Sequence, residues 1–385
     1  MIKSYNDLRF LVVFPCVMGS SLIGVGISAI SCIFRSAWLM ELNAEQVTHV
    51  GVKSPEDIVV VSALRATLTR GKKGGFKDVL ADELLMNVFK ATIERTGIDT
   101  ALVQDITGGN VCAEGNFATP SPCVQIASAI QCRLIEIGIG AGVESMTADY
   151  YNRRTPYSDK ISVVPCVADC QVPMGYTSEN VALEYGITRE DQDRFSVESH
   201  RKAHAAQQAG RFKEEIIPCT VTQIDKDGNQ KQVTVSDDDG IRPDSTLETL
   251  GKIRAAFGKD GTTTAGNASQ ISDGAAAVLL MKRKTAQKLN LPILGKYITS
   301  AAVGVPPRVA FASQAIYTVK ALEISDEKVN PNGGAIAFGH PLGCTGSRQV
   351  ATLFPELKRQ NKRYGITSMC IGSGMGMCAV WEAEY

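Results

Sequence analysis

The chain has 385 residues, of which 44% are hydrophobic and 21% charged, an ordinary composition for a globular protein large enough to form two cores. Lysine plus arginine and aspartate plus glutamate both number 40, so the formal net charge is zero, which argues against nucleic acid or acidic lipid as the main partner. The eleven cysteines show no disulfide framework, which favours a reducing compartment. The pair closest in sequence, Cys166 and Cys170, lacks the further ligands of a zinc site, so no bound metal is expected.

The N-terminal region contains an uncharged run, residues 10–34, between Arg9 and Arg35. About 20 apolar residues suffice to cross a bilayer as a helix. Pro15 and several glycines and serines lower the hydrophobicity of this run. A membrane anchor, a targeting segment and a wrongly predicted first exon therefore all remain open as explanations of residues 1–54.

From about Ser54 onward the chain alternates predicted strands and helices. Residues 57–63 form a β-branched run that is too short for a helix and predicts a buried strand. Residues 77–98 carry apolar side chains at helical spacing, with Gly97 as a plausible stop. Residues 134–145 predict a second buried strand that runs into a glycine turn. This alternation predicts an α/β fold with a parallel, covered sheet.

The middle of the chain is more polar. Thr188 can cap a long helix that closes at Gly210, and the turn-rich sequence around it predicts an excursion, about residues 150–260, that covers a site. His200 and His204 lie four residues apart on this helix and could face one metal ion. They lack the H-E-x-x-H pattern, so a solvated helix face is the favoured interpretation.

The C-terminal part of the chain repeats an earlier theme. Residues 272–281 and residues 373–382 each couple a glycine turn to a strand of small residues. Two such echoes suggest two related halves, although short echoes are weak evidence of a repeat. A boundary near residues 289–292 would divide these halves.

Three groups of residues could carry chemistry. His340 lies within residues 330–346, a stretch with five glycines and two prolines, which predicts a shaped loop that a ligand approaches closely. Cys370 precedes a glycine-rich turn, and Asn267 and Ser269 stand beside another. A histidine and a thiol on such turns suggest acid–base or nucleophilic work on an acyl or carbonyl group. A lone cysteine is more often a small buried hydrophobe, and a histidine between glycines can be a simple turn residue.

The segments "NPNGGAIAFGHPLGCTGSRQV" and "SMCIGSGMGMCAV" closely resemble the paired C-terminal signatures of the thiolase family, especially its peroxisomal 3-ketoacyl-CoA type. The resemblance covers most of the chain from about Ser54 and includes "IGAGVESMT" and "GTTTAGNASQISDGAAAVLL". It implies a duplicated five-layer αβαβα fold in which each half contributes a mixed sheet. On this basis residues 55–290 form the N-terminal half, residues 291–385 form the C-terminal half, and residues 1–54 are an unmatched apolar extension.

The resemblance also implies an activity, namely the cleavage of 3-ketoacyl-CoA by free CoA to acetyl-CoA and a shortened acyl-CoA in fatty-acid β-oxidation. His340 would activate a nucleophilic cysteine and help to bind the thioester oxygen, and Cys370 would exchange a proton with the acetyl α-carbon. CoA would be a co-substrate with no permanently bound cofactor, and the chains would form a homodimer. Four further positions are implied to line the CoA channel, the acyl pocket or the thiol turn: Ser269, Met146, Gly372 and Gly374.

The sequence departs from the family pattern in two places. Counting back without gaps from "GVES", the position of the nucleophilic cysteine falls on Asn116, and the surrounding motif is absent. Cys123 lies seven positions further on, about 10 Å along a helix, so it cannot occupy the same point without a register change. Cys112 is a weaker candidate than Cys123 for replacing that cysteine. At Arg308 and Val309 a second motif and the strand-and-helix unit before it are missing. Each half is therefore expected to lack a strand/helix unit.

These departures limit the functional prediction. Thiolysis by this chain is expected to be lost or very weak, and the alternative is a non-catalytic homologue that binds acyl-CoA or pairs with a thiolase subunit. A lost strand is expected to leave its sheet neighbours unpaired and the core open. Excisions of this kind resemble skipped exons in the gene model or the transcript. The family implies a peroxisomal location, with a mitochondrial or membrane-anchored protein as the alternative, because residues 42–50 keep only part of a peroxisomal nonapeptide.

Overall fold

The structure is a computed structural model. It describes residues 10–13, 50–113, 121–150, 158–304, 307, 312–372 and 374–385. Asn116, Arg308 and Val309, which mark the two departures from the family pattern, lie outside these residues, as does most of the uncharged run 10–34. Within the described ranges, no helix has the length and hydrophobicity needed to cross a membrane.

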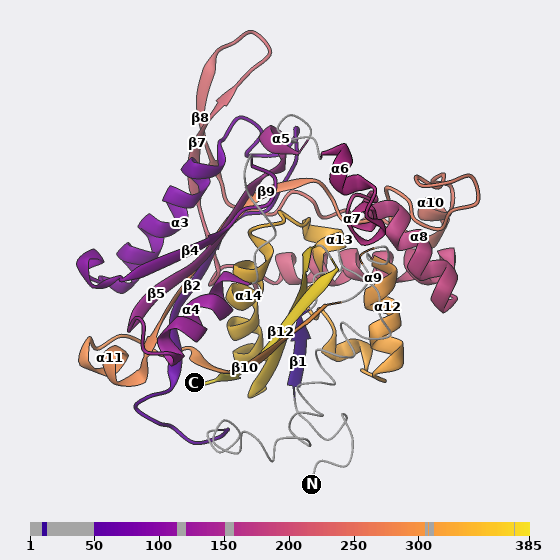
Figure 1. The fold of residues 1–385 in the computed structure, drawn as a ribbon. Coiled ribbons are helices and arrows are strands. Elements are labelled where there is room, and N and C mark those ends of the chain that lie inside the picture. Colours follow the sequence, from indigo (N-terminus) through magenta and orange to yellow (C-terminus); the bar gives the residue numbers. More distant parts are fainter. Residues whose placement is uncertain are drawn as a thin grey trace.

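The main sheet consists of two four-stranded halves that meet where β2 and β10 pair over two residues (Figure 1). The N-terminal half runs in the order β4 (Asp105–Gly109), β5 (Ile137–Ser145), β9 (Ser272–Lys282) and β2 (Ile58–Ala66). The C-terminal half runs in the order β10 (Gly295–Gly304), β12 (Met375–Ala383), β11 (Tyr364–Gly372) and β1 (Phe10–Val13). Short strands β3 (Thr69–Arg70) and β6 (Ile216–Ile217) extend β9 and β2, and β7 (Cys219–Ile224) and β8 (Gln230–Val235) form a separate hairpin.

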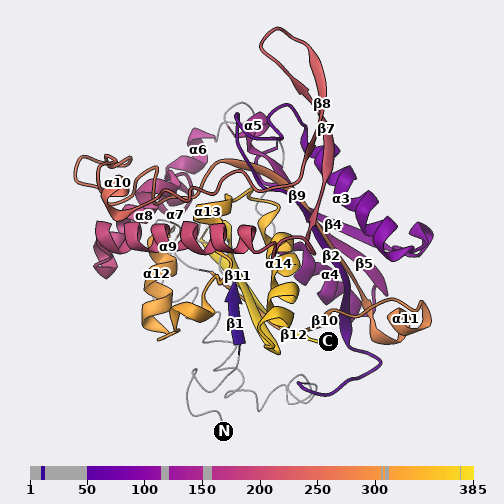
Figure 2. The same ribbon diagram turned by 180° about the vertical axis from the view of Figure 1, so that it is seen from behind.

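The helices form layers on these sheets (Figures 1 and 2). Helix α3 (Ala81–Thr96) packs on β2, β5 and β9, while α4 (Pro122–Gln131) and α14 (Thr345–Arg359) lie together on the other side of these strands. Helix α14 also packs on β11 and β12, so it is shared by both halves. The remaining α-helices among the described residues are α5 (Met146–Asp149), α6 (Asp159–Ser162), α7 (Pro165–Cys170), α8 (Met174–Tyr185), α9 (Arg189–Gln208), α10 (Leu247–Gly251), α11 (Arg283–Lys288), α12 (Ala312–Ala321) and α13 (Ala335–Phe338).

The structure confirms the predicted strands and helices but corrects the predicted sheet. The runs at 57–63 and 134–145 are β2 and β5, and every residue of both strands is buried. Gly97 ends α3 in the left-handed conformation (φ 62°). The sheet is mixed rather than parallel, because β9 lies antiparallel between β5 and β2. The long excursion between β5 and β9 allows the chain to re-enter the sheet in the opposite direction.

Helix α9 begins where its sequence predicts, but the predicted solvent exposure of His200 is wrong. Thr188 forms a capping box with Asp191, as expected from its position. His200 does not lie on a solvated face, because its side chain is only 2% exposed and its Nδ1 accepts the backbone N–H of Arg242 at 3.1 Å. In the described part of the chain, no group of three or more His, Cys, Asp or Glu side chains could hold a metal ion. His200 therefore joins α9 to the loop of Arg242 within the polar excursion.

Candidate functional site

The loop that carries His340 connects α13 to α14. Gly339 ends α13 with φ 99°, and a Cβ at this position would lie 2.5 Å from the Ser272 hydroxyl oxygen. The glycine is thus required both by its backbone conformation and by the close approach of β9. Directly after it, His340 is buried, with 2% of its surface exposed, and its backbone N–H points to the Gln270 carbonyl at 3.4 Å.

Hydrogen bonds around His340 define which of its nitrogens carries the proton. The Nδ1 atom lies 2.5 Å from the Thr345 hydroxyl oxygen, and the same hydroxyl donates to the Pro341 carbonyl at 3.1 Å. Because that hydroxyl proton is used by Pro341, Nδ1–H is the donor to Thr345 and Nε2 keeps a free lone pair. Burial, together with the charge of Arg348, lowers the pKa of His340 to about 3. A neutral imidazole whose Nε2 carries no proton is therefore the resting form.

A buried carboxylate ties this loop to the N-terminal half. Glu144 accepts backbone N–H groups from Gly343 at 2.9 Å and from Val111 and Cys112 at 3.0 Å each. Burial raises the pKa of Glu144, and these three donors oppose that shift. Sequence reasoning used "GVES" only as a landmark, yet a charged residue at the end of a fully buried strand was a signal that it binds something internal.

Cys370 lies near the end of β11, close to the start of the helix that follows His340. The strand pairing shifts register between Cys370 and Gly372. Helix α14 contacts this part of β11, since Gln349 donates to the Ser368 carbonyl at 3.0 Å. Burial raises the pKa of the Cys370 thiol to about 12, so it is protonated at neutral pH. Gly372 and Gly374 both have positive φ (106° and 80°) and form the turn that follows.

The start of helix α4 faces the same region. A Cβ built on Gly346 in the first turn of α14 would lie 3.2 Å from the hydroxyl oxygen of Ser121 and 3.3 Å from the sulfur of Met369. Ser121 is the N-cap of α4, and Met369 precedes Cys370. The N-termini of α4 and α14 and the end of β11 therefore converge. The backbone N–H groups at such helix ends favour negative charge.

The other two predicted binding residues also lie near the histidine loop. The sulfur of Met146 accepts the backbone N–H of Ser272 at 3.4 Å. Ser272 is the same residue that Gly339 approaches closely, so Met146 lies near the start of the histidine loop. Ser269 is half-buried, and its neighbour Gln270 donates its side-chain amide to the carbonyls of Gly240, Ile336 and Ala337: 2.8, 3.0 and 3.0 Å. The "AGNASQ" segment therefore supports α13 immediately before His340.

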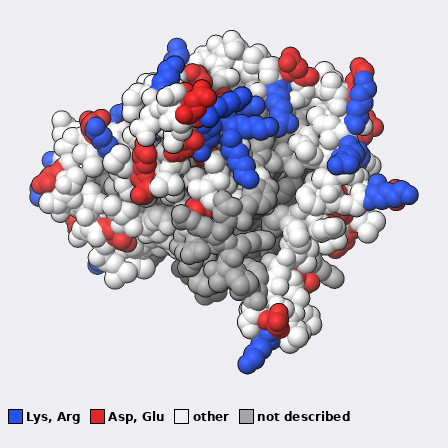
Figure 3. Space-filling view, turned by 90° about the horizontal axis from the view of Figure 1, so that it is seen from above, with Lys and Arg blue, Asp and Glu red and all other residues white. Residues whose placement is uncertain are grey.

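Arg242 is a candidate binding residue that sequence reasoning missed. It lies two residues after Gly240 and forms no ion pair with any described residue. Burial and the nearby charge of Arg70 lower its pKa. Arg70 lies 3.6 Å from a carboxylate oxygen of Asp239. Figure 3 shows Lys and Arg side chains gathering with acidic ones on the face seen from above. Nothing in the sequence distinguished this arginine from others in the polar excursion.

The two cysteines considered as replacement nucleophiles have different surroundings. Cys123 is fully buried, with its sulfur 3.5 Å from the Ser347 hydroxyl oxygen, and burial raises its pKa to about 12. Cys123 packs in the interface between α4 and α14. Cys112 is half-buried, and its backbone shares the Glu144 carboxylate with the histidine loop. Asn116, the position expected for the nucleophile, lies outside the described residues.

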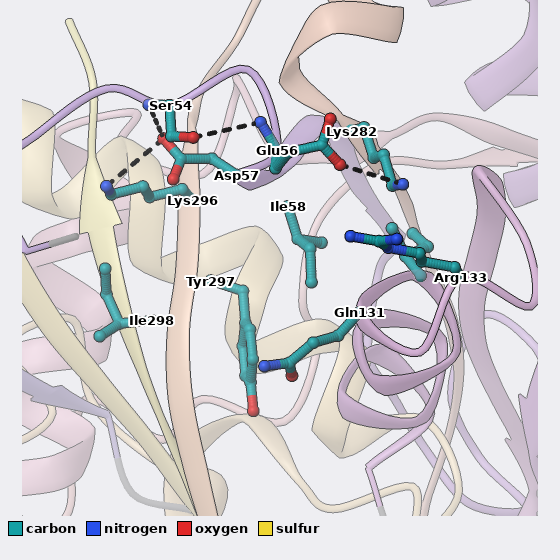
Figure 4. A pocket seen from close by; sticks show the side chains of 11 residues that line it. Ser54, Glu56, Asp57, Ile58, Gln131, Arg133, Lys282, Lys296, Tyr297 and Ile298 are labelled. Carbon is teal, nitrogen blue, oxygen red and sulfur yellow. Dashed lines mark hydrogen bonds and ion pairs between the residues drawn. The ribbon is translucent and has the colours of Figure 1, made fainter. Parts of the chain in front are cut away.

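A separate cavity of about 370 Å³ lies between the starts of β2 and β10 and the end of α4 (Figure 4). Its charged groups are largely paired internally: Lys282 with Glu56 at 3.2 Å and Lys296 with Asp57 at 3.4 Å. None of its lining residues belongs to the histidine loop or to β11. It is therefore a different feature from the candidate site.

Comparison with known proteins assigns most of the chain. The model of the thiolase N-terminal domain matches residues 58–122 and 121–284, and that of the thiolase C-terminal domain matches residues 305–383. The N-terminal match is interrupted at the start of α4, next to the first departure from the family pattern. The peroxisomal 3-ketoacyl-CoA thiolase of Yarrowia lipolytica is 44% identical over 86% of this chain and 94% of its own length. The peroxisomal 3-ketoacyl CoA thiolase 1 of Petunia hybrida is 45% identical over 85% of this chain and 84% of its own length.

Solved structures give the same assignment of the fold. The dimeric peroxisomal thiolase of Saccharomyces cerevisiae superposes with a TM-score of 0.77 at 40% identity, covering 86% of this chain and 98% of the yeast chain. The acetyl-CoA acetyltransferase of Bacillus anthracis superposes with a TM-score of 0.74 at 28% identity, covering 85% of this chain and 99% of that one. The α/β architecture predicted from the sequence is therefore confirmed.

Proposed function

The chain belongs to the thiolase family, and we propose that it is an acyltransferase of peroxisomal fatty-acid β-oxidation that acts on 3-ketoacyl-CoA with CoA as co-substrate. The observation that carries the proposal is the position of a neutral His340 directly before helix α14, whose first turns pack on the end of the strand that bears Cys370. Relatives named peroxisomal 3-ketoacyl-CoA thiolases support the substrate and the compartment, and a dimeric yeast relative supports a homodimer.

The proposed chemistry assigns opposite proton roles to the two residues. Nε2 of His340 accepts the proton of the attacking thiol as its sulfur bonds to the 3-keto carbon. When the bond between C2 and C3 of the substrate breaks, the acetyl-CoA enolate takes the proton of the Cys370 thiol at its α-carbon. The imidazolium then returns a proton to the Cys370 thiolate. The high pKa of Cys370 suits it to donate a proton to carbon rather than to act as the first nucleophile.

The attacking thiol is supplied by CoA itself in this proposal. Residues 113–121 contain no cysteine, and Cys123 is buried and protonated. Direct attack by CoA gives acetyl-CoA and the shortened acyl-CoA in one displacement, without a covalent acyl-enzyme. Because direct attack by CoA lacks the acyl-enzyme intermediate that divides the reaction into two easier steps, turnover is expected to be very slow.

Arg242 and Arg70 support CoA binding at this site. Two neighbouring guanidinium groups, one of them without an acidic partner among the described residues, would be stabilised by a phosphate group. The loop that carries Arg242 contacts Gln270 through the Gly240 carbonyl, next to Ser269, which we propose lines the pantetheine channel. Met146 would lie near the acyl group, and the backbone of Gly372 and Gly374 would provide a polar setting for the thiol.

The test measures turnover and covalent labelling on the same sample. We expect thiolysis of a 3-ketoacyl-CoA at less than a tenth of the kcat of an intact thiolase, and no acyl adduct on the intact chain in mass spectrometry. A kcat within tenfold of an intact thiolase, or a stable acyl adduct, would contradict the single displacement.

A non-catalytic acyl-CoA-binding homologue is the second candidate, because Asn116 stands where the family has its nucleophile. Equilibrium binding of acyl-CoA, measured by calorimetry without any detectable product, would favour it. Loss of binding in Arg242→Ala, but not in the exposed-cation control Arg194→Ala, would show that the CoA site itself is formed.

A further inference from the structure

Strand β1 lies at the outer edge of the C-terminal half, beside β11, which comes from the opposite end of the sequence (Figures 1 and 2). It pairs with β11 in parallel, from Phe10 opposite Tyr364 to Val13 opposite Thr367. It also contacts α14 and the short helical turn Asp326–Lys328. Four residues from the unmatched N-terminal extension are thus built into the C-terminal half of the sheet.

The strand directions show which position β1 occupies. In the N-terminal half, β2 and β9 are antiparallel, β9 and β5 are antiparallel, and β5 and β4 are parallel. In the C-terminal half, β10 and β12 are antiparallel, β12 and β11 are antiparallel, and β11 and β1 are parallel. The two patterns are the same, so β1 takes the place that β4 has in the other half.

The origin of these two outer strands differs. Residues 67–104 connect β2 to β4 and include α3. The C-terminal half has only residues 305–311 between β10 and α12, and its described residues between α12 and α14 form no strand. A crossover to a parallel strand requires a dozen or more residues, so this connection is too short to supply an equivalent of β4.

We infer that residues 10–13 are a replacement strand, which docks on the open edge of β11 and restores the outer strand that the C-terminal half cannot build from its own sequence. Without β1, β11 would expose a row of unpaired backbone N–H and C=O groups. The sequence Phe-Leu-Val-Val has the aromatic and β-branched residues typical of strands. Pro15 follows two positions later and cannot donate to a continued ladder.

The replacement strand also positions part of the candidate site. β1 pairs with residues 364–367, and Cys370 lies three positions further along the same strand. Fixing the edge of β11 therefore limits the movement of the strand that bears the thiol. It also commits the first residues of the uncharged run 10–34 to an extended conformation, which a membrane-spanning helix beginning at Phe10 could not have.

A proline substitution in the full-length chain tests this role. Val12→Pro removes a backbone donor and disfavours pairing of β1, and Val25→Pro makes the same change in the same uncharged run but outside the strand. We expect Val12→Pro to raise hydrogen exchange of those amides within 364–367 that face β1 by about tenfold or more, with the amides that face β12 as an internal reference, and Val25→Pro to leave both unchanged. Equal exchange in the two variants would overturn the inference.

Cross-linking tests the register without weakening the strand. Val12 lies opposite Ile366, so the pair Val12→Cys and Ile366→Cys should form a disulfide within one chain, detected by peptide mass spectrometry. The pair Phe10→Cys and Thr367→Cys is offset by three residues and should not. Equal cross-linking of both pairs would contradict the docking of β1 in this register. Disulfides formed only between two chains would show that the edge of β11 takes the segment of a second copy, and would likewise overturn a replacement strand within the chain.

Discussion

The N-terminal half of the sheet builds its outer strand β4 from the segment that follows β2, whereas the C-terminal half takes β1 from the opposite end of the sequence. Both halves nevertheless have the same order of parallel and antiparallel pairs. The unpaired backbone groups at an open strand edge can pair with an extended, β-prone segment from any part of the chain. The outer position of the sheet is therefore filled in both halves, although the C-terminal half lacks the segment that fills it in the N-terminal half.

The halves also differ in what they contribute to the candidate site. The C-terminal half carries His340 and the Cys370 thiol, whereas the N-terminal half supplies the surfaces that hold them. Glu144 binds the loop at Gly343, and Gly142 in β5 allows that loop to approach. If this division is correct, changes in the N-terminal half should disturb the chemistry of the C-terminal half without touching a reacting atom.

The largest expected effect is that of Gly142→Ala in β5. A Cβ at Gly142 would lie 2.1 Å from the backbone carbonyl oxygen of Gly343, which cannot move without displacing the His340 loop. We expect a loss of about 3 kcal/mol or more in the free energy of unfolding, measured by urea denaturation. Gly108→Ala in the neighbouring strand β4 is the matched control, because a Cβ there would meet nothing within 4 Å. Similar losses of stability in both variants would show that the close contact between Gly142 and the His340 loop is not required.

The second expected effect is a loss of stability in acid. Burial lowers the pKa of His200 to about 4 and that of His340 to about 3, whereas an unfolded histidine titrates near 6.5. Between these values the unfolded chain binds more protons, so stability is fully present above pH 6.5 and falls as the pH drops. Each histidine should cost up to about 2 kcal/mol between pH 7 and pH 5.

Asp273 acts in the opposite direction, because burial raises its pKa to about 6 and protonation on acidification relieves that burial cost by about 1 kcal/mol over the same range. The informative quantity is therefore the difference between variants. His200→Gln should lose less stability on acidification than the parent chain, as followed by denaturant midpoints at pH 7 and pH 5. An identical loss in the two proteins would show that His200 is not neutral and buried.

These contrasts show where sequence reasoning succeeded and where it could not reach. The predicted strands at 57–63 and 134–145 and the cap at Thr188 follow from local patterns, and the structure confirms all three. The burial of His200 could not be predicted, because its partner is a backbone N–H from a loop that is distant in the sequence. The same limitation hid Arg242, whose environment depends on how the polar excursion folds back.

The expectation of an unpaired sheet neighbour was wrong for β11, which pairs with β1, and the sequence could not show this because no local pattern connects Phe10 to β11. A short apolar strand reads equally well as part of a membrane segment when its partner lies at the other end of the chain. The strand and its partner could be joined only by the structure. The candidate site was easier to predict, because the glycines around His340 indicate from the sequence alone that the backbone of this loop lies close to another group.

The smallest expected effect on stability is that of Thr345→Val, which tests how His340 is oriented. Removing the hydroxyl deprives Nδ1–H of its acceptor, while the backbone N–H of Thr345 still donates to the Pro341 carbonyl at 3.1 Å. We expect a stability loss of about 1 kcal/mol and a change in the 15N shifts of the His340 ring, from a single Nδ1–H tautomer to a mixture. Thr352→Val removes another buried hydroxyl of α14, bonded to Glu215 at 3.1 Å, and should leave those shifts unchanged. If both variants alter the ring equally, or neither does, then Thr345 does not set the tautomer, and the N-terminal half holds the loop without determining where its proton lies.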